Sequence, residues 1–344
     1  MPKAVKKVFI FVIAIFALSF VLFHFGVKLL AQKIDKSPEY ITDFITQTNQ
    51  ENHYLNQDKL NFIFLGLDER DDVLEKTQTT DTIIFASLNL KDNKTTLISI
   101  PRDLWFYDTN SKINDIYPQS LKQKDKFTYI KDKFTQLTGQ NVDHVIVLNT
   151  INLIKFINLT GGLDVYLENG FIDKEYPNPD YIKDPKSGAS KYITVEFSSG
   201  NIHLDESNIT QFVRSRHGGD TVAQGGTDLA RIQRQQLVID ALLQKIKEGK
   251  IINSFGQLFD LYKFWDKDII KDVTDFQAFQ IGSIILKNIA NQKEFNLEKK
   301  EITVGESAKD SLIYHPTTFI NKQWVFIPAD KEYSAFHQFF SDSI

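Results

Sequence analysis

The chain has 344 residues, of which 42% are hydrophobic and 24% are charged, a composition typical of a globular protein. Its formal net charge of −4 argues against a basic surface for nucleic acid. Because the chain contains no cysteine, disulfide bonds, cysteine-ligated zinc and cysteine nucleophiles are excluded.

An apolar segment at residues 8–30 follows a short basic stretch, residues 1–7. A helix that spans a membrane needs ~20 apolar residues, whereas the apolar core of a cleaved signal peptide has ~7–15. We therefore predict one N-terminal transmembrane helix, an uncleaved signal anchor. Since lysines precede this helix, the positive-inside rule predicts a single-pass protein of the cell membrane, with a cytoplasmic N-terminus and an extracytoplasmic domain.

The segment after the anchor, residues 31–57, is polar and is predicted to form a stalk with one short amphipathic helix near residues 40–45. The domain itself is predicted over residues 58–250, and residues 251–344 are predicted to form the C-terminal part of the same domain. Neither a repeat nor a low-complexity tract is visible in the sequence.

Strand-like and helical patterns alternate through this domain. Apolar runs in LNFIFLGLD, DTIIFASLNL, KTTLISIPRDLW and DHVIVLN predict strands, and LDVYL predicts a shorter one. Helical spacing predicts helices over residues 119–139, 150–162, 205–214 and 228–248. Residues 171–200 contain three prolines and are predicted to form a loop, and QWVFIP in the tail resembles a strand. Such alternation predicts a layered α/β/α domain, with a central mixed sheet flanked by helices.

The segment FVRSRHGGDTVAQGGTDLARIQRQQ gathers Arg214, Arg216, Arg231 and Arg234 around a glycine-rich loop. Arg231 and Arg234 are three residues apart at the start of a predicted helix, so they share one of its faces. Free N–H groups at a helix start favour an anion, and a planar guanidinium suits phosphate oxygens. The cluster therefore predicts a diphosphate site. The alternative is a solvated surface on which these arginines pair with neighbouring carboxylates.

Two aspartates and a further arginine adjoin predicted strands. Asp68 and Arg102 follow strands, in LGLDER and SIPRDL, and Asp81 precedes one, in TTDT. Ligands of α/β proteins bind beyond the carboxyl ends of strands, where such side chains meet. Carboxylates repel a diphosphate unless a cation intervenes, so Asp68 and Asp81 are predicted ligands of Mg²⁺. Their alternative role is turn formation and helix capping.

Seven motifs in one order resemble the LytR-CpsA-Psr family, whose domain is also called the cell envelope-related transcriptional attenuator domain. The motifs are FLGLDER, TDTIIFASLN, TLISIPRDLW, KIND, TGGLDVYL, HLDESNITQFVRSRH and DLARIQRQQ. They span about residues 60–248, and a signal anchor before the domain is usual in this family.

The resemblance implies a phosphotransferase of cell wall assembly. Such an enzyme moves a glycopolymer from a polyprenyl-pyrophosphate carrier to a peptidoglycan acceptor, assisted by Mg²⁺ or alternatively Mn²⁺. Two other functions stay open, a regulatory protein that binds the carrier without transfer and a lipid pyrophosphatase. A nucleic-acid partner is not expected, because the chain is acidic and the domain is predicted outside the cytoplasm.

The resemblance also implies roles for individual residues. The expected pyrophosphate contacts are Arg70, Arg102, Arg214, Arg216, Arg231, Arg234 and Gln235. The expected catalytic residues are Asp68, Asp81 and Arg102, with the two aspartates serving the metal or taking the acceptor proton. His217 is a second candidate base, because the ordinary pKa of histidine is ~6.5.

One departure from the family pattern lies at residues 79–82, where this chain has TTDT and the family often has Arg-Ser-Asp-Thr. A cationic phosphate contact is therefore absent at Thr79. Arg70 or Lys76 could supply it instead. If neither does, we expect weaker pyrophosphate binding.

Overall fold

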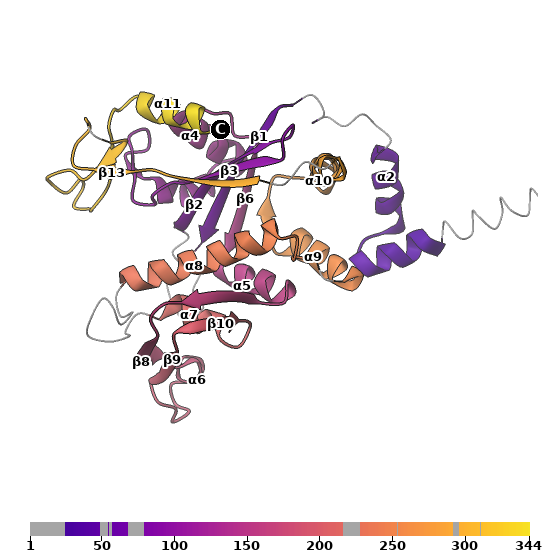
Figure 1. Cartoon of the computed structure of the whole chain (residues 1–344), viewed down its shortest axis with the longest axis horizontal. Coiled ribbons are helices and arrows are strands. Elements are labelled where there is room, and N and C mark those ends of the chain that lie inside the picture. The colour runs from indigo at the N-terminus through magenta and orange to yellow at the C-terminus, as the bar shows by residue number, and fades with distance from the viewer. Residues whose placement is uncertain are drawn as a thin grey trace, which may run out of the picture.

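The computed structural model describes residues 25–48, 54, 57–67, 79–215, 228–252, 254–291, 296–309 and 311–344. Its centre is a six-stranded sheet in the order β11-β6-β1-β2-β3-β12, and helices cover both faces (Figure 1). The strands are β1 (Lys59–Leu67), β2 (Thr80–Asn89), β3 (Lys94–Ser99), β6 (His144–Asn149), β11 (Ile270–Lys271) and β12 (Asn296–Glu301). This helix-flanked mixed sheet confirms the predicted α/β class.

The directions of the strands bring several chain segments to one edge of the sheet. β1 is parallel to β6 and antiparallel to β2, and β2 is antiparallel to β3. The ends of β1, β3 and β6 therefore lie at the same edge as the start of β2. Asp81, predicted just before a strand, is the second residue of β2 because that strand begins at Thr80. Arg102 follows the end of β3 at Ser99.

Apolar side chains on alternate strand positions build a core on each face of the sheet. On one face they pack against α3 (Ile116–Ser120), α4 (Lys126–Thr138) and α11 (Ser334–Ser343), where the rings of Phe85 and Phe340 meet edge to face at 5.0 Å. On the other face they pack against α9 (Phe255–Lys267) and α10 (Asp275–Ala290). The predicted end of a helix at Gly139 is confirmed, since Gly139 caps α4 with φ +67.

A second lobe carries its own core below the sheet in Figure 1. It contains α5 (Thr150–Leu159), β7 (Leu163–Leu167), β10 (Gly200–Leu204), α7 (Ile209–Arg214) and α8 (Asp228–Lys247). The predicted loop over residues 171–200 is wrong. This segment forms β8 (Phe171–Pro177), α6 (Pro179–Lys183) and β9 (Tyr192–Phe197). The alternate side chains of Phe171 and Asp173 are buried, and the prolines lie at the end of β8, at the start of α6 and just after α6.

Helix α8 joins the sheet to the second lobe. Asp240 of α8 pairs with Lys299 of β12, while Lys245 Nζ donates to the backbone oxygens of Thr160 and Gly162, both at 2.7 Å. These contacts link the second half of α8 both to β12 of the sheet and to the turn after α5 in the second lobe.

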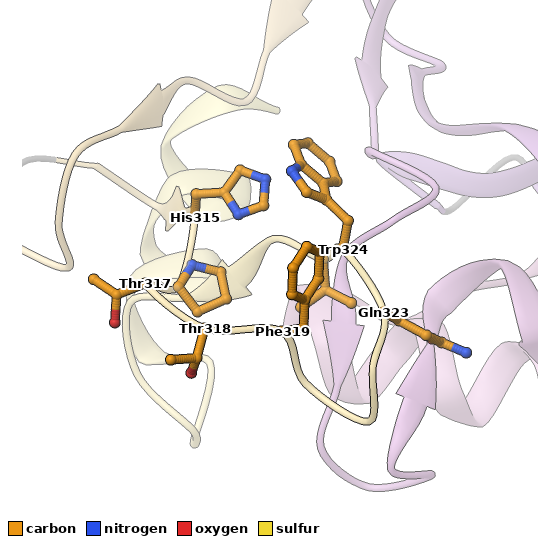
Figure 2. A pocket seen from close by; sticks show the side chains of 8 residues that line it. His315, Thr317, Thr318, Phe319, Gln323 and Trp324 are labelled. Atoms are coloured by element: carbon orange, nitrogen blue, oxygen red, sulfur yellow. The ribbon is translucent and has the colours of Figure 1, made fainter.

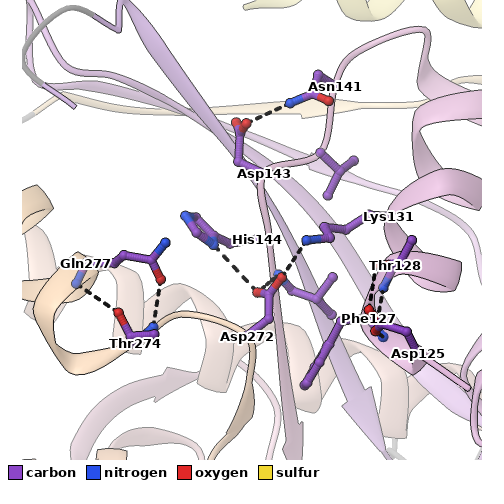
Figure 3. A network of polar contacts seen from close by, with 12 residues as sticks. Asp125, Phe127, Thr128, Lys131, Asn141, Asp143, His144, Asp272, Thr274 and Gln277 are labelled. Carbon is purple, nitrogen blue, oxygen red and sulfur yellow. Dashed lines mark hydrogen bonds and ion pairs between the residues drawn. The ribbon is translucent and has the colours of Figure 1, made fainter. Parts of the chain in front are cut away.

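A polar network lies at the start of β6, at the end of the sheet opposite Arg102 (Figure 3). The carboxylate of Asp272 accepts from the N–H of Val145 at 2.7 Å and pairs with Lys131 at 2.9 Å, and His144 Nδ1 lies 3.6 Å away. Burial raises the pKa of Asp272, but its contacts with His144, Val145 and Lys131 outweigh this effect and hold the pKa below its ordinary value. The network attaches β11 to β6.

The residues before the sheet are helical and pack on the domain. Residues 25–34 and α2 (Pro38–Thr48) contact α9 and α10. Tyr40 Oη donates to Asp275 Oδ2 at 2.5 Å, and Lys36 pairs with Asp266 at 2.7 Å. The predicted amphipathic helix near residues 40–45 is thus confirmed as α2. Most of the predicted anchor lies outside the described residues, within which no helix has the length and apolar character of a membrane span.

The C-terminal region adds β12 to the sheet beside β3, and then forms a small sheet of β13 (Val304–Gly305), β14 (Ile313–Tyr314) and β15 (Ile327–Pro328). The strand predicted in QWVFIP is shortened to β15. Phe326, just before β15, donates to the oxygen of Asp103 at 2.9 Å and accepts from the N–H of Trp105 at 2.7 Å. The tail is therefore bonded to the segment that follows Arg102.

Candidate functional site

An ion pair marks the edge where β2 starts and β3 has ended. Arg102 Nη1 lies 2.7 Å from Asp81 Oδ1, and Arg102 Nε lies 3.5 Å from Asp103 Oδ2. The side chains of Arg102 and Asp81 are 40% and 32% exposed, so a solute can reach both. The structure thus brings together two of the three residues that the sequence predicts as catalytic.

The charge of Arg102 is secured by its neighbours. Burial lowers the pKa of Arg102, but the carboxylates of Asp81 and Asp103 outweigh it and raise the pKa above its ordinary value. Lys112 Nζ pairs in turn with Asp103 Oδ1 at 2.5 Å. Arg102 is therefore a fixed cation, held from one side by a carboxylate that Lys112 neutralises.

Asp115 adds a further carboxylate three residues after Lys112. Burial raises the pKa of Asp115, against the opposing charge of Lys112. The hydroxyl of Thr80 donates to the oxygen of Asn114 at 3.3 Å, and the N–H of Asn114 donates to the oxygen of Arg102 at the same distance. Sequence reasoning assigned no role to this KIND segment. The sequence feature that could have pointed to it is a single isoleucine, buried in the structure, among three polar residues.

The second group of predicted residues lies where α7 meets α8. Arg234 is 3% exposed and donates from Nε to the oxygen of Phe212 at 2.9 Å and from Nη2 to the oxygen of Ser215. Its guanidinium lies 4.2 Å from the ring centroid of Phe171. Burial lowers the pKa of Arg234 to about 10, with Asp173 opposing this effect. Arg234 thus fastens the end of α7 to α8, and a contact of Arg234 with phosphate stays a prediction.

Three other predicted residues, Arg231, Gln235 and Arg214, lie near Arg234 and are less buried than it is. Arg231, three residues earlier on α8, is 8% exposed, whereas Gln235 is exposed and donates to the oxygen of Val213 at 3.4 Å. Arg214 is half-buried at the last position of α7. The structure therefore brings Arg214, Arg231, Arg234 and Gln235 to one helix junction.

Several predicted residues fall outside the described part of the chain, namely Asp68, Arg70, Arg216 and His217. Their described neighbours are informative. Leu67, which precedes Asp68, pairs with Thr80 at the start of β2. Ser215, which precedes Arg216, is 1% exposed and is held by Arg234.

The described residues hold no group of three or more His, Asp or Glu side chains able to bind a metal ion. Mg²⁺ requires less, since it keeps several waters and binds one or two carboxylates plus substrate phosphates. Asp81 offers one such carboxylate, about one-third exposed, and its Oδ1 is the oxygen paired with Arg102. One accessible carboxylate of this kind is compatible with Mg²⁺, and binding of the ion by Asp81 and Asp68 stays a prediction.

Comparisons with known proteins place this geometry in context. The model of the LytR_cpsA_psr family matches residues 27–325. The polyisoprenyl-teichoic acid–peptidoglycan teichoic acid transferase TagU of Enterococcus faecalis is 23% identical over 264 residues, which cover 74% of this chain and 76% of the relative. The protein of that name from Bacillus cereus is 24% identical over 260 residues, covering 74% and 73%.

Solved structures share the fold. The crystal structure of B. subtilis TagV matches with a TM-score of 0.54 and 17% identity, covering 84% of this chain and 98% of that one. A structure of TagT bound to LIIa-WTA matches with a TM-score of 0.50 and 17% identity, covering 83% and 91%.

Proposed function

This chain belongs to the LytR_cpsA_psr family, and we propose that it transfers a glycopolymer from a polyprenyl-pyrophosphate carrier to peptidoglycan on the outer side of the cell membrane. The observation that carries the proposal is the Arg102–Asp81 pair, which places a permanent cation and a carboxylate together at an accessible sheet edge. The names of the relatives support it, since they describe transfer of polyisoprenyl-linked teichoic acid to peptidoglycan.

Transfer of a phosphoryl group asks a protein chiefly to position the reactants and neutralise charge. Arg102 would bind oxygens of the pyrophosphate, since its guanidinium stays charged and its pairs with Asp81 and Asp103 leave further N–H donors. Arg214, Arg216 and Arg231 would hold the remaining phosphate oxygens from the α7–α8 side. The leaving polyprenyl phosphate would then depart from a site rich in fixed positive charge.

The acceptor hydroxyl must lose a proton as it attacks the phosphorus next to the sugar. A carboxylate at the same edge, Asp81 or Asp68, would take this proton. Asp81 and Asp68 are also the residues that would hold Mg²⁺, which when bound supplies positive charge to phosphate oxygens. Asp103 and Lys112 would keep Arg102 in place during the reaction, because they fix its Nε side.

The test uses the full chain in detergent micelles, a short sugar on polyprenyl pyrophosphate, peptidoglycan fragments and Mg²⁺, with products read by mass spectrometry. We expect a sugar–phosphate–peptidoglycan product that disappears on adding EDTA and in Arg214→Ala. Release of phosphate without a new bond would support the pyrophosphatase instead. Binding of the carrier without any turnover would support the regulatory protein and direct attention to Thr79.

A further inference from the structure

A small hollow opens in the C-terminal region, at the hairpin that precedes β15 (Figure 2). Its volume is about 150 Å³, and its walls include the rings of Phe319 and Trp324 and the polar side chains of Thr317, Thr318 and Gln323. Phe319 is 70% exposed and Trp324 is 46% exposed. Two large exposed rings at one hollow form an apolar patch of the kind that marks an interaction site.

The hollow is built on a tight hairpin. The backbones of Ile320 and Gln323 exchange hydrogen bonds of 3.2 and 2.8 Å, and the two residues between them, Asn321 and Lys322, have φ of 50 and 62. A two-residue turn with both φ values positive is the tightest connection for a hairpin, and it strains non-glycine residues. The turn therefore holds Phe319 and Trp324 at a fixed spacing.

Trp324 is supported from within the protein. Its ring centroid lies 3.7 Å from that of His315 and 4.7 Å from that of Phe326, both in edge-to-face arrangements. Contacts on two sides fix the plane of the indole, so that a ligand can stack on it without paying to order the side chain.

The lining points to one chemistry of ligand. It contains aromatic rings, hydroxyls, a carboxamide and an imidazole, and no Asp, Glu, Lys or Arg side chain is among the lining residues. Such a surface suits a neutral molecule that has apolar C–H faces and hydroxyl or amide edges, as a sugar ring does. An anionic glycopolymer or a pyrophosphate would instead require cations, which this protein has at Arg102 and at the α7–α8 junction.

The hollow is connected through the backbone to the segment that carries Arg102. Phe326 is bonded through its backbone to Asp103 and Trp105, so it adjoins the residue next to Arg102. Trp324 precedes Phe326 by two residues, a separation of at most ~7 Å along an extended chain. A glycan chain that passes over Trp324 can therefore reach Arg102 within a few sugar units.

We propose that this hollow binds a neutral sugar ring of the acceptor glycan and so presents the neighbouring hydroxyl to the Arg102–Asp81 edge. The proposal rests on the proposed transfer function. The ligand is the peptidoglycan strand, because its repeating N-acetylated sugars are uncharged in their rings and amides, as the uncharged lining requires.

Binding of chitotetraose, a neutral tetramer of β-linked N-acetylglucosamine, tests the hollow independently of any transfer. The full chain in detergent micelles is titrated and the affinity measured by calorimetry. We expect roughly tenfold weaker binding in Trp324→Ala and in Phe319→Ala, since each removes a stacking surface worth about one factor of ten. Tyr166→Ala is the matched control, because Tyr166 is an exposed ring, 65% accessible, on β7.

The transfer assay then separates the two proposals. With peptidoglycan fragments as acceptor, Trp324→Ala should raise the acceptor KM about tenfold while carrier binding stays unchanged. Binding of chitotetraose by wild-type protein without any transfer would remove the proposed function and keep the hollow as a glycan site. Equal affinity for chitotetraose in wild type, Trp324→Ala and Tyr166→Ala, absent binding in wild type, or preference of the hollow for an anionic teichoic acid fragment would each overturn the assignment.

Discussion

Replacing Arg234 with Met tests whether this buried arginine serves the architecture or the substrate. The change keeps most of the length of the side chain and removes the guanidinium that bonds to Phe212 and Ser215 and stacks on Phe171. Met is chosen because Ala would add a cavity to the loss of the charge.

The magnitude follows from opposing contributions at a side chain that is 3% exposed. Two bonds from a charged donor contribute about 1.5–3 kcal/mol each, and the stacking on Phe171 adds about 1 kcal/mol. Against them stand the burial of the guanidinium, which lowers the pKa of Arg234 to about 10, and the apolar surface that Met buries in its place. We therefore expect Arg234→Met to lower the free energy of unfolding by about 2 kcal/mol.

Thermal unfolding of the full chain and hydrogen exchange of the α7 amides measure this loss. The melting temperature should fall by about 4 °C, and the amides of Phe212 to Ser215 should exchange faster. Gln233→Met is the control, since Gln233 is an exposed neighbour on the same helix. If Arg234→Met leaves both readouts at wild-type values and still abolishes transfer, the reasoning is refuted and Arg234 acts as a substrate ligand.

Three further predictions concern other parts of the molecule. Arg102→Ala should lower the transfer rate by roughly 10²–10³-fold in the mass-spectrometric assay, whereas Lys91→Ala, which removes an exposed ion pair with Asp58 at the opposite edge of the sheet, should leave the rate intact. Asp272→Asn should destabilise the domain at neutral pH. Because the folded pKa of Asp272 lies below its ordinary value of 3.8, the stabilisation is present above about pH 4 and is lost as the pH falls through the folded pKa. The denaturant midpoints of variant and wild type should therefore converge in acid, and a gap that stays constant with pH would contradict the role of ionisation. Gly139→Ala should cost about 1–2 kcal/mol or more, because φ is +67 and an added Cβ would lie 2.6 Å from His337 Cγ; an unchanged melting temperature would show that this turn relaxes freely.

The central strands could be predicted because the sheet is covered on both faces, which leaves long apolar runs in β1, β2 and β6. Residues 171–200 could not be predicted as a hairpin, since their alternation is short and prolines at the ends of β8 and α6 obscure it. The sequence also does not show which strand lies at an edge. The addition of β12 beside β3 joins residues just over 200 positions apart, and such pairing follows from packing rather than local pattern.

The residue types of the candidate site could be predicted from the sequence, but the separate roles of its arginines could not. Every arginine of the chain lies in the predicted site, at positions 70, 102, 214, 216, 231 and 234, while lysine supplies the other long cationic side chains. Arginine is the better residue for planar, bidentate contacts, so this separation is a sequence signal in its own right. Burial decides which arginine binds backbone and which faces solvent, and the contrast between Arg234 and Arg102 emerges only from the fold.

The docking of α2 on α9 and α10 has a consequence for how the protein would meet the lipid-linked carrier proposed as its substrate. A polar, unattached stalk would let the domain sample many heights above a bilayer and many tilts. Here the bond from Tyr40 to Asp275 and the pair of Lys36 with Asp266 fix the segment next to the predicted anchor on the domain itself. If residues 8–30 cross the membrane as predicted, the sheet edge with Arg102 is held at one height and one angle. A carrier confined to the same bilayer would then reach the cationic side chains of the site by lateral diffusion alone. The acceptor would be the reactant that has to approach from the side away from the membrane.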